Sequence, residues 1–252
     1  MSPTTNVLIT GANRGLGRGF LQNYLARPNH TVIGTLRDVS APVAAELREI
    51  VPAVGSRLIL VKIESSNFSD PAEAVRQLEA EGIDTLDLVI ANAGITGVQG
   101  PIATVDLEDT RNVLEVNTLG PVALFIATRP LLERAANPKW LSISTALATI
   151  GGLESLMAFP SLSYGASKAA LNYVTQSIHL WHAKITAVSV HPGYVATDMG
   201  MLSAEFYKIP NAADIAISVE KSVTDLVKIV DNATRAEHSG KFFSHDGTTL
   251  PW

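Results

Sequence analysis

The chain of 252 residues contains no cysteine. Disulfide bonds, thiolate metal ligands and a cysteine nucleophile are therefore excluded, and we expect no metal site. Basic side chains are also scarce, with 19 Lys and Arg against 24 Asp and Glu, and they form no cluster. The resulting net charge of −5 argues against nucleic acid and against anionic membrane surfaces as partners.

Long apolar runs are missing as well. The apolar stretches are short and broken by polar residues, whereas a membrane-spanning helix needs about 20 predominantly apolar residues. Residues 1–6 lack the basic and then apolar pattern of a signal peptide. We therefore expect a cytoplasmic protein without a membrane span. With 46% hydrophobic residues, the chain has enough apolar side chains for a sizeable core.

Short apolar runs alternate with longer helical patterns along the whole chain. This alternation is typical of parallel βαβ units with right-handed crossovers. No linker, repeat or low-complexity segment divides the chain, so residues 1–252 are predicted to form one doubly wound α/β (Rossmann) domain. It would have a seven-stranded, mostly parallel sheet with helices on both faces. The predicted strands are 7–9, 31–36, 57–63, 87–90, 140–144, 185–190 and 241–243, and the predicted helices include 42–51, 71–80, 107–135 and 212–230.

The first predicted strand is followed by a glycine-rich turn, residues 10–17, and then by a helical pattern. Glycines permit a tight turn and a close approach of the backbone. The helix that follows brings N–H groups and a positive helix end to a phosphate. We therefore predict a site for the phosphates of a dinucleotide here, rather than a plain turn. Its candidate contacts are Gly11, Asn13, Arg14, Gly15, Leu16 and Gly17.

The end of the second predicted strand indicates which dinucleotide binds. In dinucleotide-binding folds an acidic residue at this place binds the ribose 2′-hydroxyl, whereas an arginine accommodates a 2′-phosphate. Here Leu36 fills the position of the acid and Arg37 follows it, while Arg14 in the glycine turn is a second candidate for the same phosphate. We therefore predict NADP(H), with a solvated loop charge as the alternative explanation of Arg37.

Tyr164 and Lys168 lie four residues apart at the start of an apolar helical pattern. This spacing places both side chains on one face of a helix. A free tyrosine has a pKa near ~10, and an ammonium held beside it lowers that pKa by favouring the phenolate. The pair is then suited to protonating a carbonyl oxygen or deprotonating an alcohol. Because the spacing is common, an ordinary helix is the alternative.

Five motifs occur in one order: the glycine turn 10–17, Asn92-Ala93-Gly94, Asn117, the Tyr164 and Lys168 pair, and Pro192-Gly193. With this order and spacing the chain resembles the short-chain dehydrogenase/reductase family over nearly its whole length. The tail, residues 246–252, and the Asn-Arg pair of the glycine turn resemble the branch that holds C-factor-like and carbonyl-reductase-like proteins. Fungal ketoreductases of the norsolorinic-acid type are similar too.

The resemblance implies a role for each matching position. Tyr164 would be the acid/base, Lys168 would lower its pKa and hold the nicotinamide ribose, and Asn117 would support a proton-relay water. Packing would equally explain Val195, and a helix cap would equally explain Thr197. The further implied cofactor contacts are Asn92 and Gly94 on the adenosine side, Glu64 at the adenine in place of the usual Asp, and Pro192, Gly193, Val195 and Thr197 near the nicotinamide carboxamide.

The hydroxyl that polarises the substrate carbonyl has two candidates. The family usually has a Ser-Ser pair after the fifth strand, with the second serine catalytic, whereas this chain has Ser144-Thr145. The register places Thr145 at the catalytic position, and a threonine hydroxyl can donate the same hydrogen bond. Ser144 is expected to be a strand-end residue. Residues 151–161 lengthen the connection to Tyr164, so Ser144 stays a candidate.

The predicted reaction is hydride transfer from NADPH to the carbonyl carbon of a small molecule. A dinucleotide-binding regulator without turnover, and NADP-linked alcohol oxidation or racemisation, are the alternatives. Many members of the resembled family form dimers or tetramers, yet carbonyl-reductase-like members can be monomeric. A homodimer, a homotetramer and a monomer therefore all stay open.

Two segments should emerge beside the substrate, residues 146–162 and 194–209. They contain no arginine and a single lysine, Lys208, whereas an anionic substrate would need a cationic clamp. Part of their apolar content is ordinary packing, but the whole favours an apolar, aromatic or polyketide-like ketone or aldehyde. The apolar side chains are Leu147, Ile150, Leu153, Leu156, Met157, Phe159, Tyr194, Met199, Met201, Leu202, Phe206 and Tyr207.

Overall fold

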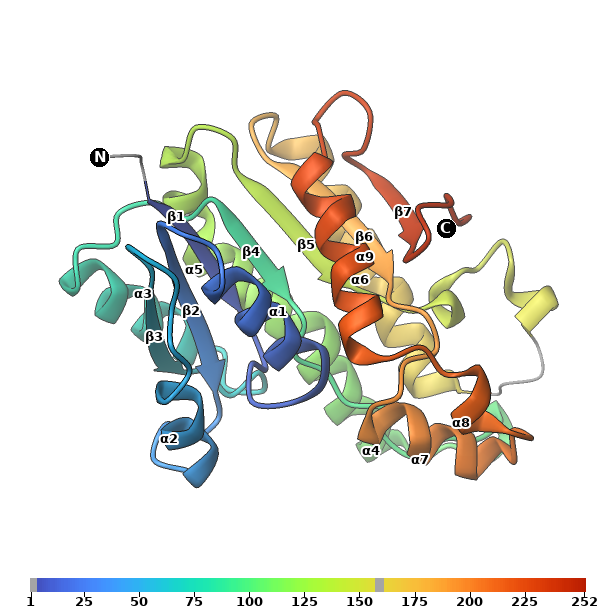
Figure 1. The fold of residues 1–252 in the computed structure, drawn as a ribbon. Coiled ribbons are helices and arrows are strands. Elements are labelled where there is room, and N and C mark those ends of the chain that lie inside the picture. Colours follow the sequence, from blue (N-terminus) through green and yellow to red (C-terminus); the bar gives the residue numbers. More distant parts are fainter. Residues whose placement is uncertain (1–3, 157–160) are drawn as a thin grey trace.

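The computed structural model describes residues 4–156 and 161–252. Its centre is one seven-stranded sheet in the order β3-β2-β1-β4-β5-β6-β7 (Figure 1). Every pair of neighbouring strands is parallel, so the sheet is parallel throughout and not merely for the most part. The strands are β1 Thr5–Ile9, β2 His30–Leu36, β3 Arg57–Lys62, β4 Leu88–Ala91, β5 Lys139–Ile143, β6 Thr186–His191 and β7 Lys241–Ser244.

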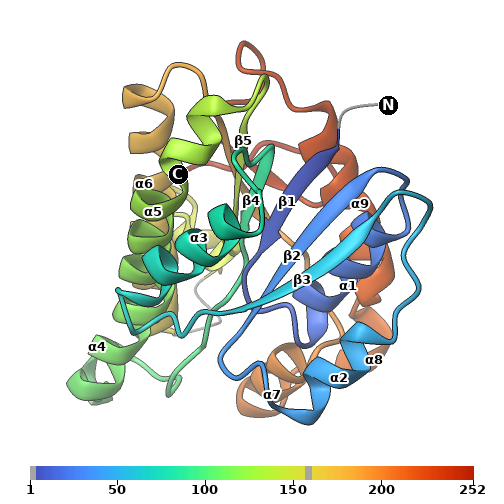
Figure 2. The same ribbon diagram turned by 90° about the vertical axis from the view of Figure 1, so that its left-hand side faces the viewer.

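Helices cover both faces of the sheet, as Figure 2 shows. One face packs against α1, α2 and α9, and the other packs against α3, α5 and α6. The predicted doubly wound α/β fold is therefore confirmed. The helices are α1 Gly15–Leu25, α2 Pro42–Arg48, α3 Asp70–Ala80, α4 Leu107–Leu114, α5 Gly120–Arg134, α6 Leu162–Trp181, α7 Asp198–Tyr207, α8 Ala212–Ile215 and α9 Val219–Asn232.

The strands are apolar on both sides because both faces of the sheet are covered. In β1, Val7 and Ile9 belong to the core under α1 and α9, while Leu8 belongs to the opposite core. The strand order reverses between β1 and β4, whose residues Val7 and Leu88 pair. In open parallel sheets ligands bind at such a switch point, beyond the carboxyl ends of the strands. The glycine turn after β1 lies at this place.

Two helix predictions, and the expectation that loops follow the fifth and sixth strands, were wrong in detail. The helix predicted over residues 107–135 is interrupted by a π-helical turn, Glu115–Leu119, between α4 and α5. Pro121 lacks the N–H that an α-helix would donate to the carbonyl of Asn117, and this removes one α-helical hydrogen bond there. The helix predicted over 212–230 is two helices, α8 and α9. Most of the predicted loop 194–209 is α7, and residues 146–156 contain two short 3₁₀ turns, Ala146–Ala148 and Leu153–Leu156.

The chain after β7 turns back along that strand. Phe243 and Thr249 form an antiparallel bridge, and the Leu250 N–H donates to the Phe242 carbonyl at 2.8 Å. The tail then reaches the segment after β5, and Figure 1 shows the C-terminus beside this yellow-green segment.

Candidate active site

The glycine turn has the backbone shape that a bound phosphate requires. Gly11 and Gly15 adopt the left-handed region, with φ of +66° and +53°. A Cβ on Gly17 would lie 2.1 Å from the Gly11 carbonyl oxygen, so only glycine fits there. No side chain caps α1, which follows the extended Arg14. The N–H groups of its first turn are therefore available to an anion, and the turn fits the phosphates of a dinucleotide.

Asn92, which follows β4, is hydrogen-bonded to Thr10 at the end of β1, where the glycine turn begins. Its side-chain amide donates to the Thr10 carbonyl at 2.8 Å. The Thr10 hydroxyl accepts the N–H groups of Asn92 and Ala93 at 2.9 and 3.0 Å. Asn92 therefore fixes the glycine turn to β4.

The candidate residues for the adenosine end lie at the tips of β2 and β3. Leu36 is buried in the core, whereas Arg37 is exposed and forms no ion pair with the described residues. Arg14 instead pairs with Asp198 at the start of α7, at 2.7 Å between two exposed side chains. At the end of β3, the Glu64 carboxylate accepts the Ser66 hydroxyl at 3.3 Å.

Tyr164 and Lys168 lie in the first two turns of α6. Lys168 is 3% exposed, and its ammonium donates to the Ile143 carbonyl at the end of β5 at 2.8 Å. That ammonium lies 6.0 Å from the centroid of the Tyr164 ring. The Tyr164 hydroxyl forms no hydrogen bond with the described residues. It is therefore free to bond a substrate oxygen.

The sequence predicted that Lys168 lowers the pKa of Tyr164, but the surroundings that the protein itself provides raise this pKa. Burial raises the pKa of Tyr164 to about 12 and lowers the pKa of Lys168 to about 8. The reason is that desolvation disfavours the charged form of each group, while the ammonium of Lys168 is directed at the Ile143 carbonyl. At neutral pH Tyr164 is thus protonated, the form that can give a proton to a carbonyl oxygen.

Asn117 links the loop after β4 to α6. Its side-chain oxygen accepts the Ile95 N–H at 2.9 Å, and its amide nitrogen donates to the Ile95 carbonyl and to the Ser167 hydroxyl at 2.7 and 3.0 Å. A Cβ on Gly94 would lie 3.0 Å from the Asn117 oxygen and 3.3 Å from the Lys168 nitrogen. Gly94 therefore borders the Tyr164 and Lys168 pair, rather than only the adenosine side that the family resemblance implied.

The two candidate hydroxyls differ in their surroundings. Thr145 is extended and starts the 3₁₀ turn after β5, where its hydroxyl oxygen accepts the Leu147 N–H at 3.3 Å. The proton of that hydroxyl is still available to a substrate. The hydroxyl of Ser144 is buried and has no hydrogen-bond partner in residues 4–156 and 161–252. Since alternate strand residues share a face, Ser144 lies on the side of Ser142, which bonds Thr175 of α6 at 2.8 Å.

The segment after β6 runs from the Pro192-Gly193 pair to the start of α7. Gly193 has a φ of +84°, and a Cβ there would lie 2.7 Å from Ile217. Val195 is 5% exposed and bridges Ile217, so it packs. Thr197 caps α7, because its hydroxyl oxygen accepts the Gly200 N–H at 3.1 Å. Both alternative explanations of Val195 and Thr197 hold in the structure. Thr197 also borders the glycine turn, since a Cβ on Gly15 would lie 3.5 Å from it.

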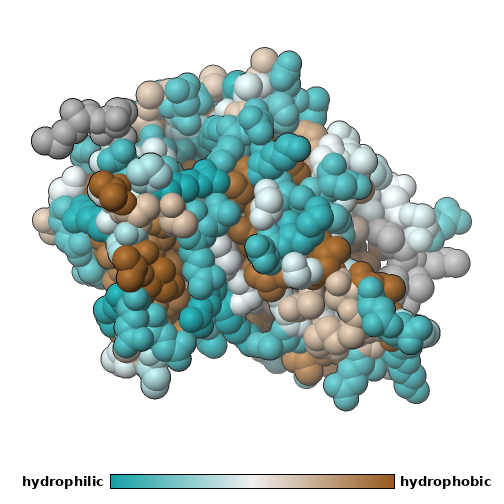
Figure 3. Space-filling view, viewed as in Figure 1, coloured by the Kyte–Doolittle hydropathy of each residue, from teal (hydrophilic) through white to brown (hydrophobic). Residues whose placement is uncertain are grey.

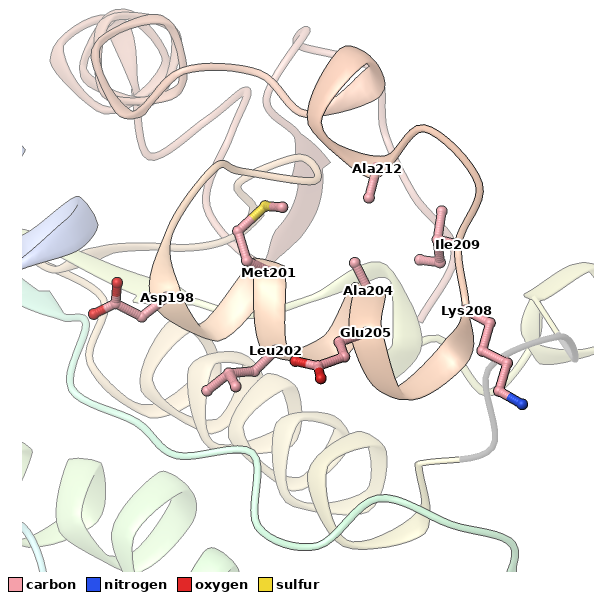
Figure 4. Close-up of a pocket in the computed structure, with 8 residues that line it drawn as sticks. All are labelled: Asp198, Met201, Leu202, Ala204, Glu205, Lys208, Ile209 and Ala212. Carbon is pink, nitrogen blue, oxygen red and sulfur yellow. The ribbon is translucent and has the colours of Figure 1, made fainter.

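A cavity of about 650 Å³ lies along α7, between this helix and α8 (Figure 4). Met201, Ala204 and Ala212 point into the space between the two helices, whereas Lys208 extends away from it. Neither Tyr164 nor Lys168 lines this cavity. Its lining consists of Asp198, Met201, Leu202, Ala204, Glu205, Lys208, Ile209 and Ala212.

Several groups of the site escaped the sequence reasoning. The Ile143 carbonyl that holds Lys168 and the Ile95 backbone that holds Asn117 are main-chain groups, which no side-chain pattern reveals. Ser167, which is fully buried and accepts a hydrogen bond from Asn117, could have been proposed as a site residue because it lies beside Lys168 in the sequence. Asp198, which forms the ion pair with Arg14, directly follows the capping Thr197 and could also have been proposed as a site residue.

A family model described as short chain dehydrogenase matches residues 5–208. The short-chain dehydrogenase srdF of Neurospora crassa is 41% identical and covers 100% of this chain and 99% of that protein. The norsolorinic acid ketoreductase of Aspergillus parasiticus is 38% identical, over 98% of this chain and 91% of that protein. The NADPH-bound carbonyl reductase from chicken fatty liver is 30% identical with a TM-score of 0.87, over 99% of this chain and 95% of that one. The chain belongs to the short-chain dehydrogenase/reductase family.

This membership makes the protein an oxidoreductase of a family that binds a nicotinamide dinucleotide. Across residues 4–156 and 161–252, no cluster of three His, Asp or Glu side chains could hold a metal ion. In the same residues, no helix is long and apolar enough to span a membrane.

Proposed function

We propose that the protein is an NADPH-dependent reductase of apolar ketones or aldehydes. The observation that carries the proposal is the Tyr164 and Lys168 pair, whose protonated phenol lacks a partner in the described residues and lies near the carboxyl end of β5. The uncapped start of α1 supports a dinucleotide at the same edge of the sheet. A binding protein without turnover would have no use for a buried ammonium held beside an unpaired tyrosine.

Each side chain would make one contribution to the reduction. Tyr164 gives its proton to the carbonyl oxygen as the carbonyl carbon is reduced. The hydroxyl of Thr145 donates a hydrogen bond to the same oxygen and stabilises the charge that develops on it. Lys168 has two N–H groups beyond the one on Ile143, and these suit ribose hydroxyls. When bound, the nicotinamide supplies the hydride.

The choice of NADP(H) rests on the two arginines near the adenosine end. Arg37 is exposed and without an ion pair in the described residues, so a 2′-phosphate would give it a partner. One oxygen of the neighbouring Asp38 carboxylate, Oδ1, accepts both the N–H and the hydroxyl of Ser40. Arg14 would exchange Asp198 for the phosphate.

Replacing Arg37 with alanine is expected to weaken NADPH binding more than NADH binding. A charge-assisted hydrogen bond contributes roughly 1.5–3 kcal/mol, with solvent screening placing an exposed arginine near the lower end. Titration of both cofactors against both proteins measures the difference. Arg76→Ala on α3, which also removes an exposed arginine, is the matched control. Equal losses for NADPH and NADH would contradict the assignment.

The apolar substrate is supported by the surface around α7 and α8, where Figure 3 shows brown and tan residues. Met201, Leu202 and Phe206 are 38%, 65% and 51% exposed. Ile150 and Leu153, from the segment after β5, are also exposed. Met157 and Phe159, which the sequence places in the same lining, lie outside the described residues.

Turnover with matched ketones tests the function directly. We expect NADPH oxidation with hydrophobic ketones, and a kcat/KM at least about tenfold lower for carboxylated or phosphorylated analogues, because an apolar lining leaves the anion without a partner. A preference for the charged analogues would contradict the apolar substrate and leave the reductase standing. No turnover with any carbonyl compound, despite tight NADPH binding, would favour a regulator.

A further inference from the structure

The last residues of the chain hold a fixed place against β7. The indole ring of Trp252 stacks on Phe242, with 5.7 Å between ring centroids and 20° between the planes. The backbone just before it is held by the hydrogen bond from Leu250 to Phe242. Trp252 is thus anchored both through its ring and through the preceding backbone.

From this position Trp252 binds the segment that follows β5. Its carbonyl oxygen accepts the Gly151 N–H at 2.9 Å and the Thr149 hydroxyl at 3.5 Å. The same Thr149 hydroxyl accepts the Gly152 N–H at 3.0 Å. A Cβ on Gly152 would lie 3.3 Å from the ring of Pro251, so the tail and the segment are in close contact.

The bound segment begins at Thr145 and contacts the start of α6. Thr145 opens the 3₁₀ turn whose Leu147 carbonyl lies 3.1 Å from the place where a Cβ on Gly165 would be. Gly165 directly follows Tyr164 in the sequence. A shift of residues 145–152 would therefore move the Thr145 hydroxyl relative to the Tyr164 hydroxyl.

Burial alone does little to hold the outer part of this segment. Ile150 is 77% exposed and Leu153 is 51% exposed, so these side chains gain little from the core. The turns are 3₁₀ turns, whose hydrogen-bond geometry is poorer than that of an α-helix. Thr149 is itself buried, at 4% exposed, so the contacts to Trp252 matter most for the outer residues, where Gly151 donates to the Trp252 oxygen.

We propose that Trp252 is a positioning residue that holds residues 145–152 against α6, so that the Thr145 hydroxyl and the Tyr164 hydroxyl converge on one substrate oxygen. The proposal rests on the proposed reductase function. Small displacements of such groups matter, because a misplacement of about 1 Å can cost about 10²-fold in rate.

The test compares the full chain with a variant that ends at Pro251. Trp252→Phe is the conservative variant, which keeps an aromatic ring for Phe242 and keeps the backbone carbonyl. Thr248→Ala is the matched control, because its hydroxyl bonds Asp246 within the same tail and does not contact residues 145–152. Hydrogen exchange at the Gly151 amide, the dissociation constant of NADPH, and kcat with an apolar ketone are measured for each.

In the shortened variant we expect exchange at Gly151 to be about tenfold faster, as the loss of such a hydrogen bond implies. We expect kcat to fall about 10- to 100-fold, with the dissociation constant of NADPH unchanged. Trp252→Phe should restore kcat, and Thr248→Ala should resemble the full chain.

Unchanged exchange at Gly151, or equal losses of kcat and of NADPH affinity, would overturn the proposal. So would a loss of kcat in Thr248→Ala as large as in the shortened variant, since that would indicate general weakening of the tail. If the full chain reduces no ketone, the reductase function fails, and exchange at Gly151 still decides whether Trp252 holds the segment.

Discussion

Replacing Tyr164 with phenylalanine is expected to lower turnover by about 10²–10⁴-fold, the contribution of a positioned general acid. The change keeps the ring and removes only the hydroxyl, which has no hydrogen-bond partner among the described residues. Folding and cofactor binding should therefore be nearly intact. Steady-state kinetics with an apolar ketone, together with a titration of NADPH, measures both effects.

The matched control for this variant lies on the same helix. Tyr173 is 75% exposed on α6, so Tyr173→Phe removes a hydroxyl of the same kind in solvent and should leave turnover unchanged. If Tyr164→Phe kept most of its activity, another group would have to supply the proton. Tyr164 is protonated at neutral pH, which is the form that the reduction requires.

Replacing Thr145 with valine is expected to lower turnover by about 10²–10³-fold, by analogy with the loss of one donor to a developing oxyanion. Valine has nearly the shape of threonine, so the 3₁₀ turn loses only the bond from the Leu147 N–H. Turnover with saturating NADPH and ketone is the measurement. Thr149→Val is not a suitable control, because its hydroxyl is bonded to Trp252.

Ser144→Ala is the informative comparison. The buried Ser144 hydroxyl has no hydrogen-bond partner in the part of the chain that the structure describes, so its removal leaves no group there unpaired. We expect turnover to change much less than in Thr145→Val, with no loss of thermal stability. The opposite order of effects would show that Ser144, and not Thr145, polarises the carbonyl.

The sequence was sufficient to predict the sheet, because the central strands are buried on both faces and therefore read as short apolar runs. The glycine turn was equally predictable. The left-handed φ of Gly11 and Gly15 and the close contact at Gly17 disfavour residues other than glycine at these positions. The spacing of Tyr164 and Lys168 predicted that they share one face of a helix, and the order of the other motifs favoured a functional pair over an ordinary helix. Each of these features depends on residues close together in the sequence, so the sequence pattern is sufficient to predict it.

The features that sequence reasoning missed depend on contacts between distant segments. Helix α7 buries only Ala204, so it lacks the apolar stripe by which helices are recognised. The direction of the Lys168 ammonium depends on the carbonyl of Ile143, 25 residues away. For the same reason the pKa of Tyr164 was predicted in the wrong direction, since its burial was not apparent from the spacing of two side chains.

The tail along β7 has a consequence for association between copies of the chain. An open strand edge invites pairing with another molecule, and the antiparallel bridge of Phe243 and Thr249 covers part of the β7 edge. At the other edge, β3 is flanked by the exposed charges of Arg57 and Lys62, which disfavour strand addition.

The sheet is thus protected at both edges against extension into a larger sheet. Large apolar side chains are exposed on the helices α5 and α6, where Ile126, Tyr173 and Trp181 are 67%, 75% and 79% exposed. Any dimer or tetramer is therefore expected to form by packing of helices. Such an interface would not involve the strand edges, and it would leave the carboxyl ends of the strands accessible to ligands.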